Sequence, residues 1–319
     1  MRGMNENATA PGPAAAAPEP DLSVRIGSLR MKNPVTVASG TFGYGREYEP
    51  FFDLSELGAV TCKGIRLSPC EGNGQPRIAE VRGGMLNAIG LQGPGVEAFV
   101  RTALPFLRER GVPAIVNIWG TTEGEYADVA RRLSDAEGVG ALEMNVSCPN
   151  VYLGGATFGT DPATLASVVR AVRAATPLPL LVKLAPNVPD VALFARVAEG
   201  EGADGLSICN TVPAMKIDVE ARRPFLANVQ GGLSGPAIHP VAVRLVWRAA
   251  AAVKIPIVGM GGISEPEDAV EFLCAGATAV AVGTANFADP RTALAVADGI
   301  RAYMERHGCA SVREIAIPP

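Results

Sequence analysis

The chain has 319 residues, of which 48% are hydrophobic and 19% are charged, with a formal net charge of −4. This composition predicts a folded chain with a sizeable core and excludes a mainly disordered one. Lys and Arg form no cluster, and no apolar run reaches the ~18 residues of a membrane span, so we expect neither nucleic acid nor a membrane as partner.

The first twenty residues, "MRGMNENATAPGPAAAAPEP", are a low-complexity Ala/Pro stretch without the apolar core of a signal peptide. We therefore predict a disordered tail over residues 1–20, a single domain over residues 21–319 and a cytoplasmic location. The six cysteines form no C-x-x-C pair, so we expect neither disulfides nor a metal or cluster site in this chain.

After the tail, "LSVRIGSLRMKNP" is typical of a β-hairpin. Short runs rich in Val, Ile and Leu then recur with little alternation, as in parallel strands covered by helices. We predict strands at Val35–Ser39, Ala59–Lys63, Ala114–Ile118, Leu142–Val146, Leu180–Leu184, Gly205–Cys209, Pro256–Met260 and Ala279–Gly283. Amphipathic stretches such as Asp161–Thr176 and His239–Val253 lie between them and predict helices.

Eight strands, each followed by a helix, predict a (β/α)8 TIM barrel of the α/β class, with the hairpin capping its bottom. A doubly wound open sheet is the competing architecture, but it usually has fewer strands. No G-x-G-x-x-G follows the first strand, which gives dinucleotide binding by that route little support.

Polar side chains at the carboxyl ends of barrel strands are active-site candidates. The predicted strands end in or near Ser39, Lys63, Asn117, Asn145, Lys183, Asn210 and Thr211. A single buried amide often only satisfies a backbone group. So many polar residues converging on one rim are hard to explain by stability alone, and they predict a functional site there.

The last two loops, "VGMGGIS" (Val258–Ser264) and "AVGTANF" (Ala281–Phe287), are rich in glycine. Glycine lets backbone amides approach an anion, so the loops predict a phosphate site, although either alone could be a tight turn. A phosphosugar or flavin mononucleotide (FMN) would fit. The amides and lysines favour FMN, whose pyrimidine edge needs hydrogen-bond donors. Lys63 or Lys183 would also suit a Schiff-base lyase, so this alternative stays open.

Four longer motifs, "GMLNAIGLQGPG", "NVSCPNVYLGGATFGTDP", "LANVQGGLSGPAI" and "VAVGTANFADP", resemble the class 1 dihydroorotate dehydrogenases. The resemblance covers nearly the whole chain from about Leu22. "CPNV" followed by "GGATFGTDP", together with "GGLSGPAI", is more similar to the NAD-linked B type than to the fumarate-using A type. The resemblance implies a flavoprotein oxidoreductase of pyrimidine biosynthesis that oxidises dihydroorotate to orotate.

The resemblance also implies roles for individual residues. Cys148 matches the catalytic base, and Lys63 supplies a cation to both substrate and flavin. The matching substrate contacts are Lys63, Asn87, Ala88, Ile89, Gly90, Leu91, Asn145, Asn150, Asn210 and Thr211. The matching FMN contacts are Ser39, Lys63, Gly64, Asn117, Asn145, Lys183, Cys209 and Gly235, with Gly261, Gly262, Gly283 and Thr284 around the phosphate.

In the implied mechanism, the Cys148 thiolate removes the C5 proton of dihydroorotate while the hydride at C6 passes to flavin N5. A free thiol has a pKa of roughly 8.5, so partial ionisation near neutrality needs no strong perturbation. A lone cysteine after a strand is more often a buried hydrophobe. The flanking Ser147, Pro149 and Asn150, with nearby glycines, favour instead a loop that carries the thiol onto a substrate.

Trp119 departs from the family pattern, which has a small residue there. It either packs under the rim, the simpler interpretation, or narrows access near the flavin.

The chain has no NAD-binding fingerprint and no cluster-binding cysteine set. The B-type resemblance therefore implies a partner subunit with FAD and a [2Fe–2S] cluster, in a heterotetramer that contains a homodimer of this chain. Four alternatives remain: a fumarate-linked A-type enzyme, a dihydropyrimidine-type reductase, the Schiff-base lyase, and a flavin-binding scaffold without turnover.

Overall fold

The computed structural model describes residues 19–146 and 158–318. Its centre is a nearly closed barrel of eight parallel strands, which confirms the predicted TIM barrel. Each neighbouring pair around the sheet is parallel, in the spatial order β3, β16, β15, β10, β9, β8, β7, β4. The barrel strands are β3 (Val35–Val37), β4 (Val60–Ile65), β7 (Ala114–Ile118), β8 (Val139–Asn145), β9 (Leu180–Lys183), β10 (Gly205–Ile208), β15 (Ile257–Met260) and β16 (Ala279–Val282).

The seam between β3 and β4 closes the barrel through only a few hydrogen bonds. The Gly58 amide donates to the Val35 carbonyl across 2.9 Å. The Thr36 hydroxyl donates to the Ala59 carbonyl across 2.9 Å and lies 3.0 Å from the Thr61 hydroxyl. Buried threonines therefore supply part of the pairing that a full backbone ladder supplies elsewhere.

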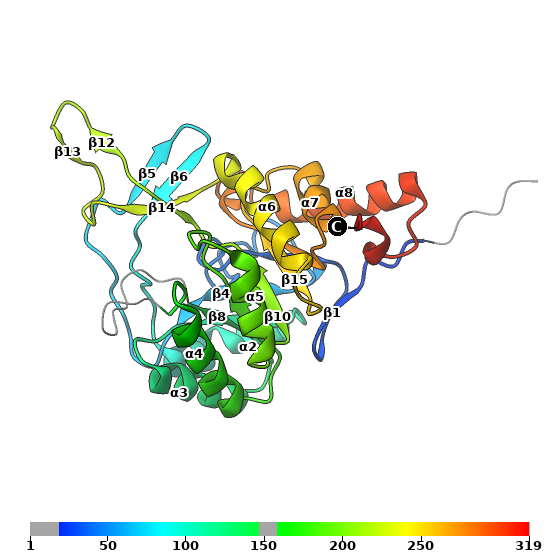
Figure 1. Ribbon diagram of the computed structural model, residues 1–319, viewed down its shortest axis with the longest axis horizontal. Coiled ribbons are helices and arrows are strands. Elements are labelled where there is room, and N and C mark those ends of the chain that lie inside the picture. The colour runs from blue at the N-terminus through cyan, green and yellow to red at the C-terminus, as the bar shows by residue number, and fades with distance from the viewer. Residues whose placement is uncertain (1–18, 147–157, 319) are drawn as a thin grey trace, which may run out of the picture.

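Helices surround the barrel (Figure 1). In α4 the stripe Leu165, Val168, Val169 and Val172 is fully buried, and the Asp161 carboxylate caps the helix by accepting from the Thr164 amide. The helices are α1 (Val96–Thr102), α2 (Leu104–Glu109), α3 (Glu123–Ser134), α4 (Pro162–Ala175), α5 (Val191–Gly200), α6 (His239–Ala250), α7 (Pro266–Cys274) and α8 (Thr292–His307), with 3-10 turns η1 (Leu54–Glu56), η2 (Pro236–Ile238), η3 (Thr284–Phe287) and η4 (Val312–Ile315).

The predicted amino-terminal hairpin is confirmed as β1 (Val24–Ile26) paired with β2 (Leu29–Met31). Ile26 lies against Gly205 at the start of β10, and Leu29 lies against Gly140 near the start of β8. The hairpin therefore covers the amino-terminal end of the barrel, opposite to the end where the polar residues gather.

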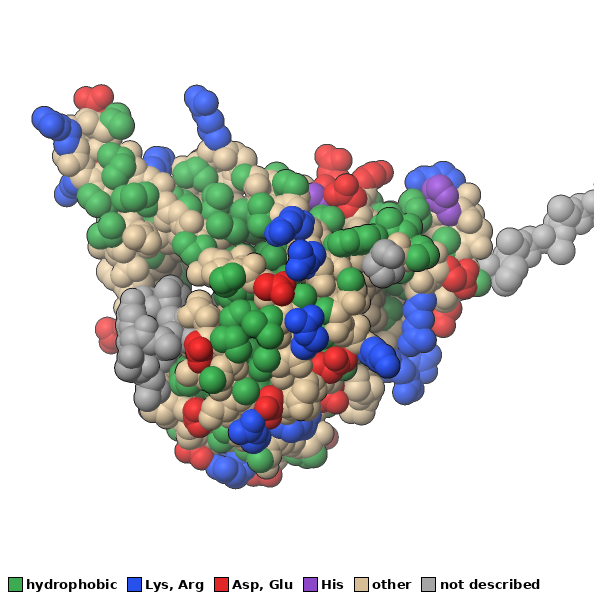
Figure 2. Space-filling view, viewed as in Figure 1, with side chains coloured by type: hydrophobic (Ala, Val, Ile, Leu, Met, Phe, Trp, Pro, Cys, Tyr) green, Lys and Arg blue, Asp and Glu red, His purple; other side chains and the backbone are tan. Residues whose placement is uncertain are grey.

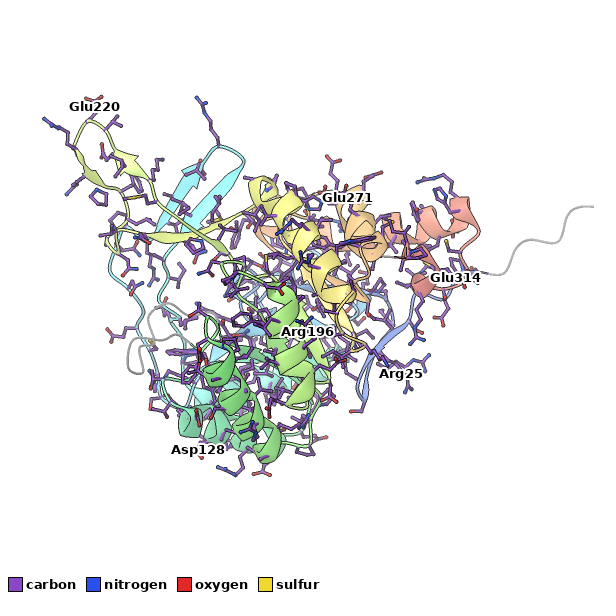
Figure 3. The ribbon with its side chains drawn as sticks, in the orientation of Figure 1. Arg25, Asp128, Arg196, Glu220, Glu271 and Glu314 are labelled. Atoms are coloured by element: carbon purple, nitrogen blue, oxygen red, sulfur yellow. The ribbon has the colours of Figure 1, made fainter. Side chains whose placement is uncertain are left out.

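A second sheet, which the sequence reading missed, stands at the other end of the barrel. Its strand order is β11 (Val212–Ala214), β14 (Gly231–Ser234), β6 (Gly84–Asn87) and β5 (Ile78–Val81). The small hairpin β12 (Ile217–Asp218) and β13 (Arg223–Pro224) extends from it as an arm (Figure 1). Figure 3 shows Glu220 at the arm's tip, and Figure 2 shows hydrophobic side chains along the arm beside basic ones.

Within the described ranges, no helix has the length and apolar character that crossing a membrane would require.

Candidate active site

A cavity of about 660 Å³ opens at the carboxyl ends of the barrel strands, within the size range of small-molecule sites. The second sheet forms one of its walls through Met85, Asn87 and Gly232. The cavity brings together every predicted site residue in the described ranges, namely Ser39, Lys63, Gly64, Asn87, Ala88, Ile89, Gly90, Leu91, Asn117, Asn145, Lys183, Cys209, Asn210, Thr211, Gly235, Gly261, Gly262, Gly283 and Thr284. The remaining two, Cys148 and Asn150, lie outside the described residues.

Strand register sets the rim of this cavity. Asn117 pairs with Glu143 across β7 and β8, and Asn145 pairs with Lys183 across β8 and β9. The Lys183 ammonium donates to the Ser39 hydroxyl across 3.2 Å. Parallel pairing thus places Asn117 beside Glu143 and, two residues further along β8, Asn145 beside Lys183 at the carboxyl end of the barrel.

Glu143 is a buried acid that the sequence reading gave no role. It is 1% exposed, and its Oε1 accepts from Asn117 Nδ2 across 2.6 Å. Its Oε2 accepts from the Ser207 hydroxyl across 2.6 Å, and Lys183 Nζ lies 3.7 Å from Oε1. The available signal was an acidic residue inside an otherwise apolar strand, because buried carboxylates are rare unless they are paired.

Lys63 projects from β4 into the cavity and is half-buried. Burial lowers the pKa of its ammonium below 10.5, the Arg77 cation lowers it further, and Glu47 acts in the opposite direction. An ammonium that is partly desolvated and next to a second cation is well placed to attract an anion.

The segment from Asn87 to Leu91 is held by two residues that the sequence reading missed, Asn73 and Arg77. Asn73 donates through Nδ2 to the Ala88 carbonyl and through its backbone amide to the Ile89 carbonyl, both across 2.9 Å. The Ala88 amide donates to the Arg77 carbonyl across 2.8 Å. Gly90 has a φ of +76°, and a Cβ there would lie 2.6 Å from the Asn73 nitrogen. The segment is therefore a fixed wall of the cavity.

The glycine loops form a tight cradle beside the start of α6. Gly262 has a φ of +77°, and a Cβ there would lie 2.7 Å from the His239 Cβ and 2.9 Å from the Gly235 carbonyl oxygen. His239 is the first residue of α6, so a helix amino terminus faces the cradle. Across the loops, the Thr284 hydroxyl donates to the Ser234 hydroxyl at 2.7 Å. Glycine loops beside a helix amino terminus suit a phosphate group.

Two further side chains bear on the predictions. Burial raises the pKa of the Cys209 thiol to about 12, so this cysteine lines the cavity as a neutral group. Trp119 is 5% exposed, lies outside the cavity lining and is covered by the Arg66 guanidinium at 4.8 Å from its ring. The burial of Trp119 agrees with the simpler interpretation, that it packs under the rim of the barrel.

The chain is similar to known proteins over most of its length. The family profile described as "Dihydroorotate dehydrogenase" matches residues 21–304. A relative from Trichlorobacter lovleyi, named "Dihydroorotate dehydrogenase B (NAD(+)), catalytic subunit", is 54% identical over 93% of this chain and 98% of its own. Relatives with the same name from Geotalea uraniireducens and Alkaliphilus metalliredigens are each 52% identical, over 93% and 92% of this chain and 97% of their own.

These matches confirm the resemblance that the four motifs indicated, including its B-type character. The chain belongs to the dihydroorotate dehydrogenase family.

Proposed function

We propose that this protein is the flavin-binding catalytic subunit of an NAD-linked enzyme that oxidises dihydroorotate to orotate. The observation that carries the proposal is one cavity in which a glycine cradle, two lysines and an amide cluster converge. Relatives that are named dihydroorotate dehydrogenase B (NAD(+)), catalytic subunit, support the same function.

The cavity's donors and acceptors fit FMN. Gly261, Gly262, Gly283 and Thr284 would hold its phosphate through backbone amides and a hydroxyl, and the close approach at Gly262 leaves no room for a side chain. Ser39, Lys63, Gly64, Asn117, Asn145, Lys183, Cys209 and Gly235 would surround the rest of the cofactor. When bound, FMN supplies an acceptor for the substrate's hydride.

The chain's own residues would bind and deprotonate the substrate. The wall formed by Asn87, Ala88, Ile89, Gly90 and Leu91 lines the same cavity as the amide cluster, and the two would hold the pyrimidine ring together. In addition, Lys63, Asn145, Asn150, Asn210 and Thr211 would bind its polar groups. Lys63 suits the substrate carboxylate because it is a partly buried cation.

Cys148 is our assignment for the base that takes the C5 proton. It follows the last residue of β8, Asn145, by three positions. A strand end at the cavity rim is where barrel enzymes carry catalytic groups.

An NAD-linked reaction requires a route for electrons out of this chain. We propose a partner subunit with FAD and a [2Fe–2S] cluster, bound to a homodimer of this chain in a heterotetramer. The cytoplasmic location expected from the sequence stays a prediction. Without its partner, the protein should accept electrons from dihydroorotate but reduce NAD⁺ poorly.

The deciding experiment is an anaerobic absorbance spectrum of FMN-replete protein before and after addition of dihydroorotate. Bleaching of the flavin band is the expected result. Cys148→Ala should slow it by about 10²- to 10⁴-fold, while Cys274→Ala, at the end of α7, should not. An unbleached flavin would refute the substrate, and uracil would be tested next. Failure to bind FMN would favour the Schiff-base lyase, which borohydride trapping at Lys63 or Lys183 would reveal.

Reoxidation of the bleached flavin by fumarate would identify an A-type enzyme instead. Appreciable NAD⁺ reduction by this chain alone, free of any iron–sulfur protein, would contradict the need for a partner.

A further inference from the structure

Glu143 lies beneath the rim of the cavity without contributing to its lining. Its two carboxylate oxygens accept from residues on two different strands, Asn117 on β7 and Ser207 on β10. Lys183, on β9, lies 3.7 Å away. Three strands of the barrel are thus tied to one buried carboxylate, and two of the three partners, Asn117 and Lys183, line the cavity.

The first consequence concerns the orientation of the Asn117 amide. A carboxylate only accepts hydrogen bonds, so the Asn117 atom 2.6 Å from Glu143 is the amide nitrogen. The amide oxygen then points the other way. It lies next to Gly64, where a Cβ would be 2.9 Å from it. The cavity wall therefore receives an acceptor at this point, which refines the sequence-based view of Asn117 as a donor.

The second consequence concerns charge. Glu143 and Lys183 are both almost fully buried, and their opposite charges offset each other. In a poorly solvated interior a charge acts over several ångströms far more strongly than in water. A cation near the flavin's pyrimidine edge stabilises the anionic reduced ring. A carboxylate 3.7 Å behind that cation weakens this effect.

We propose that Glu143 is a positioning residue that turns the Asn117 amide oxygen toward the cavity and limits the positive charge that Lys183 presents to the bound flavin. The proposal rests on the proposed function, because it assumes a flavin in this cavity. The Asn117 amide oxygen suits the ring imide N–H of a flavin. Lys183, with its charge partly offset by Glu143, sets how readily that flavin is reduced.

The test compares Glu143→Gln with the wild type, using the flavin midpoint potential and the affinity for sulfite, which adds to flavin N5 and leaves a negative charge on the ring. Glu143→Gln keeps the size of the side chain and removes its charge. We expect a more positive potential and a sulfite Kd lower by about tenfold, because the negative charge 3.7 Å from Lys183 Nζ is removed. Thr61→Val is the matched control: it removes a buried hydrogen bond inside the barrel with no change in charge and should alter neither value.

Glu143→Asp separates orientation from charge. It keeps the carboxylate but shortens the side chain, so contact with Asn117 is weakened. We expect FMN affinity to fall by about tenfold, with a potential near that of the wild type. If Glu143→Gln does not fold, Glu143→Asp tests the proposal alone. A Kd for FMN in Glu143→Asp equal to that of the wild type would then overturn the proposal.

Wild-type potential and sulfite affinity in a flavin-bound Glu143→Gln protein would also overturn the proposal. Failure of the wild type itself to bind FMN would instead refute the proposed function. The two failures are therefore distinguishable.

Discussion

Asn210 Nδ2 donates to Asn145 Oδ1 across 3.3 Å, so an amide just after β10 is joined to one at the end of β8, past the strand β9 that lies between them. Asn210 Oδ1 also accepts from the Thr211 amide across 2.8 Å. These contacts fix which end of each amide is the oxygen, since each N–H must meet an acceptor. Asn145 therefore turns its amide oxygen toward Asn210, and its amide nitrogen points away from Asn210.

Asn145→Asp tests this arrangement. The variant retains an oxygen for Asn210 but loses the amide donors and adds a negative charge beside the site proposed for an anionic substrate. We expect the Kd of orotate, titrated through the flavin spectrum, to rise by about tenfold or more. Asn228→Asp adds the same charge at the exposed mouth of the cavity and should have a much smaller effect. Equal effects of the two variants would contradict the prediction.

The barrel was predictable from the sequence because its strands are buried on both faces. The strand β7 is buried at every position, and its sequence is a continuous apolar run interrupted only by Asn117. Such a run predicts a buried parallel strand without any knowledge of distant contacts. The ends of the strands were predicted less accurately than their positions. The strand predicted to end at Ser39 stops at Val37, and the one predicted to end at Lys63 continues to Ile65. Polar rim residues do not reveal where pairing ends.

The second sheet escaped the sequence reading because its strands are short and come from distant parts of the chain. Leu86 of β6 pairs with Leu233 of β14, almost 150 positions later. The one local signal was the hairpin of β5 and β6, where Gly83, at a φ of +76°, lies in the two-residue turn. The predicted site residues that lie in the described ranges line one cavity. The contacts of Glu143 reach three other strands, and no local pattern in the sequence encodes them.

Gly262→Ala tests the phosphate cradle. The new methyl group would meet His239 Cβ at 2.7 Å and the Gly235 carbonyl at 2.9 Å, at a φ that L residues rarely adopt. Overpacking of this kind costs about 1–3 kcal/mol, so we expect the Kd of FMN to rise by about tenfold or more. Fluorescence titration with FMN measures it.

Gly308→Ala is the matched control for backbone strain. Gly308 caps the end of α8 with a φ of +69°, and a Cβ there meets nothing within 4 Å. The variant should lose about 1–2 kcal/mol of unfolding free energy from the left-handed conformation alone, with an unchanged Kd for FMN. A cradle variant that binds FMN as tightly as this control would refute the phosphate assignment.

The lowered pKa of Lys63 predicts how orotate binding depends on pH. Burial and Arg77 make its ammonium lose a proton at a lower pH than an exposed lysine does. If the charged form binds the carboxylate, orotate affinity should fall as pH rises, with a midpoint below 10.5. Lys63→Met should weaken binding by about tenfold or more at neutral pH and abolish this pH dependence. Lys32→Met, at an exposed position, should do neither.

The same shift makes a prediction about stability. The folded protein binds this proton less tightly than the unfolded chain, so protonated Lys63 costs free energy at neutral pH, and the cost disappears above the unfolded pKa. Lys63→Met should therefore be at least as stable as the wild type in urea at neutral pH, despite its loss of binding. A clear loss of stability would mean that Lys63 is structural.

Thiol alkylation separates buried cysteines from a catalytic one. Burial raises the pKa of Cys62 and of Cys209 to about 12, and both are almost fully buried. Only the thiolate reacts, so iodoacetamide should leave both unlabelled in the folded protein at pH 8, near the ordinary thiol pKa of roughly 8.5. Both should react in urea. Peptide mass mapping gives the labelling of each site.

Cys148 should behave differently if it is the base. A base must be reachable by substrate and ionise near neutrality, so we expect Cys148 to be alkylated in the folded protein at a rate that rises with pH. Orotate should protect it, because the product would fill the space through which the reagent enters. Cys209 lines the same cavity and is the internal control, since its raised pKa keeps it unlabelled with or without orotate. Alkylation of Cys209 with Cys148 left unlabelled would contradict the assignment of Cys148 as the base and point to Cys209 instead.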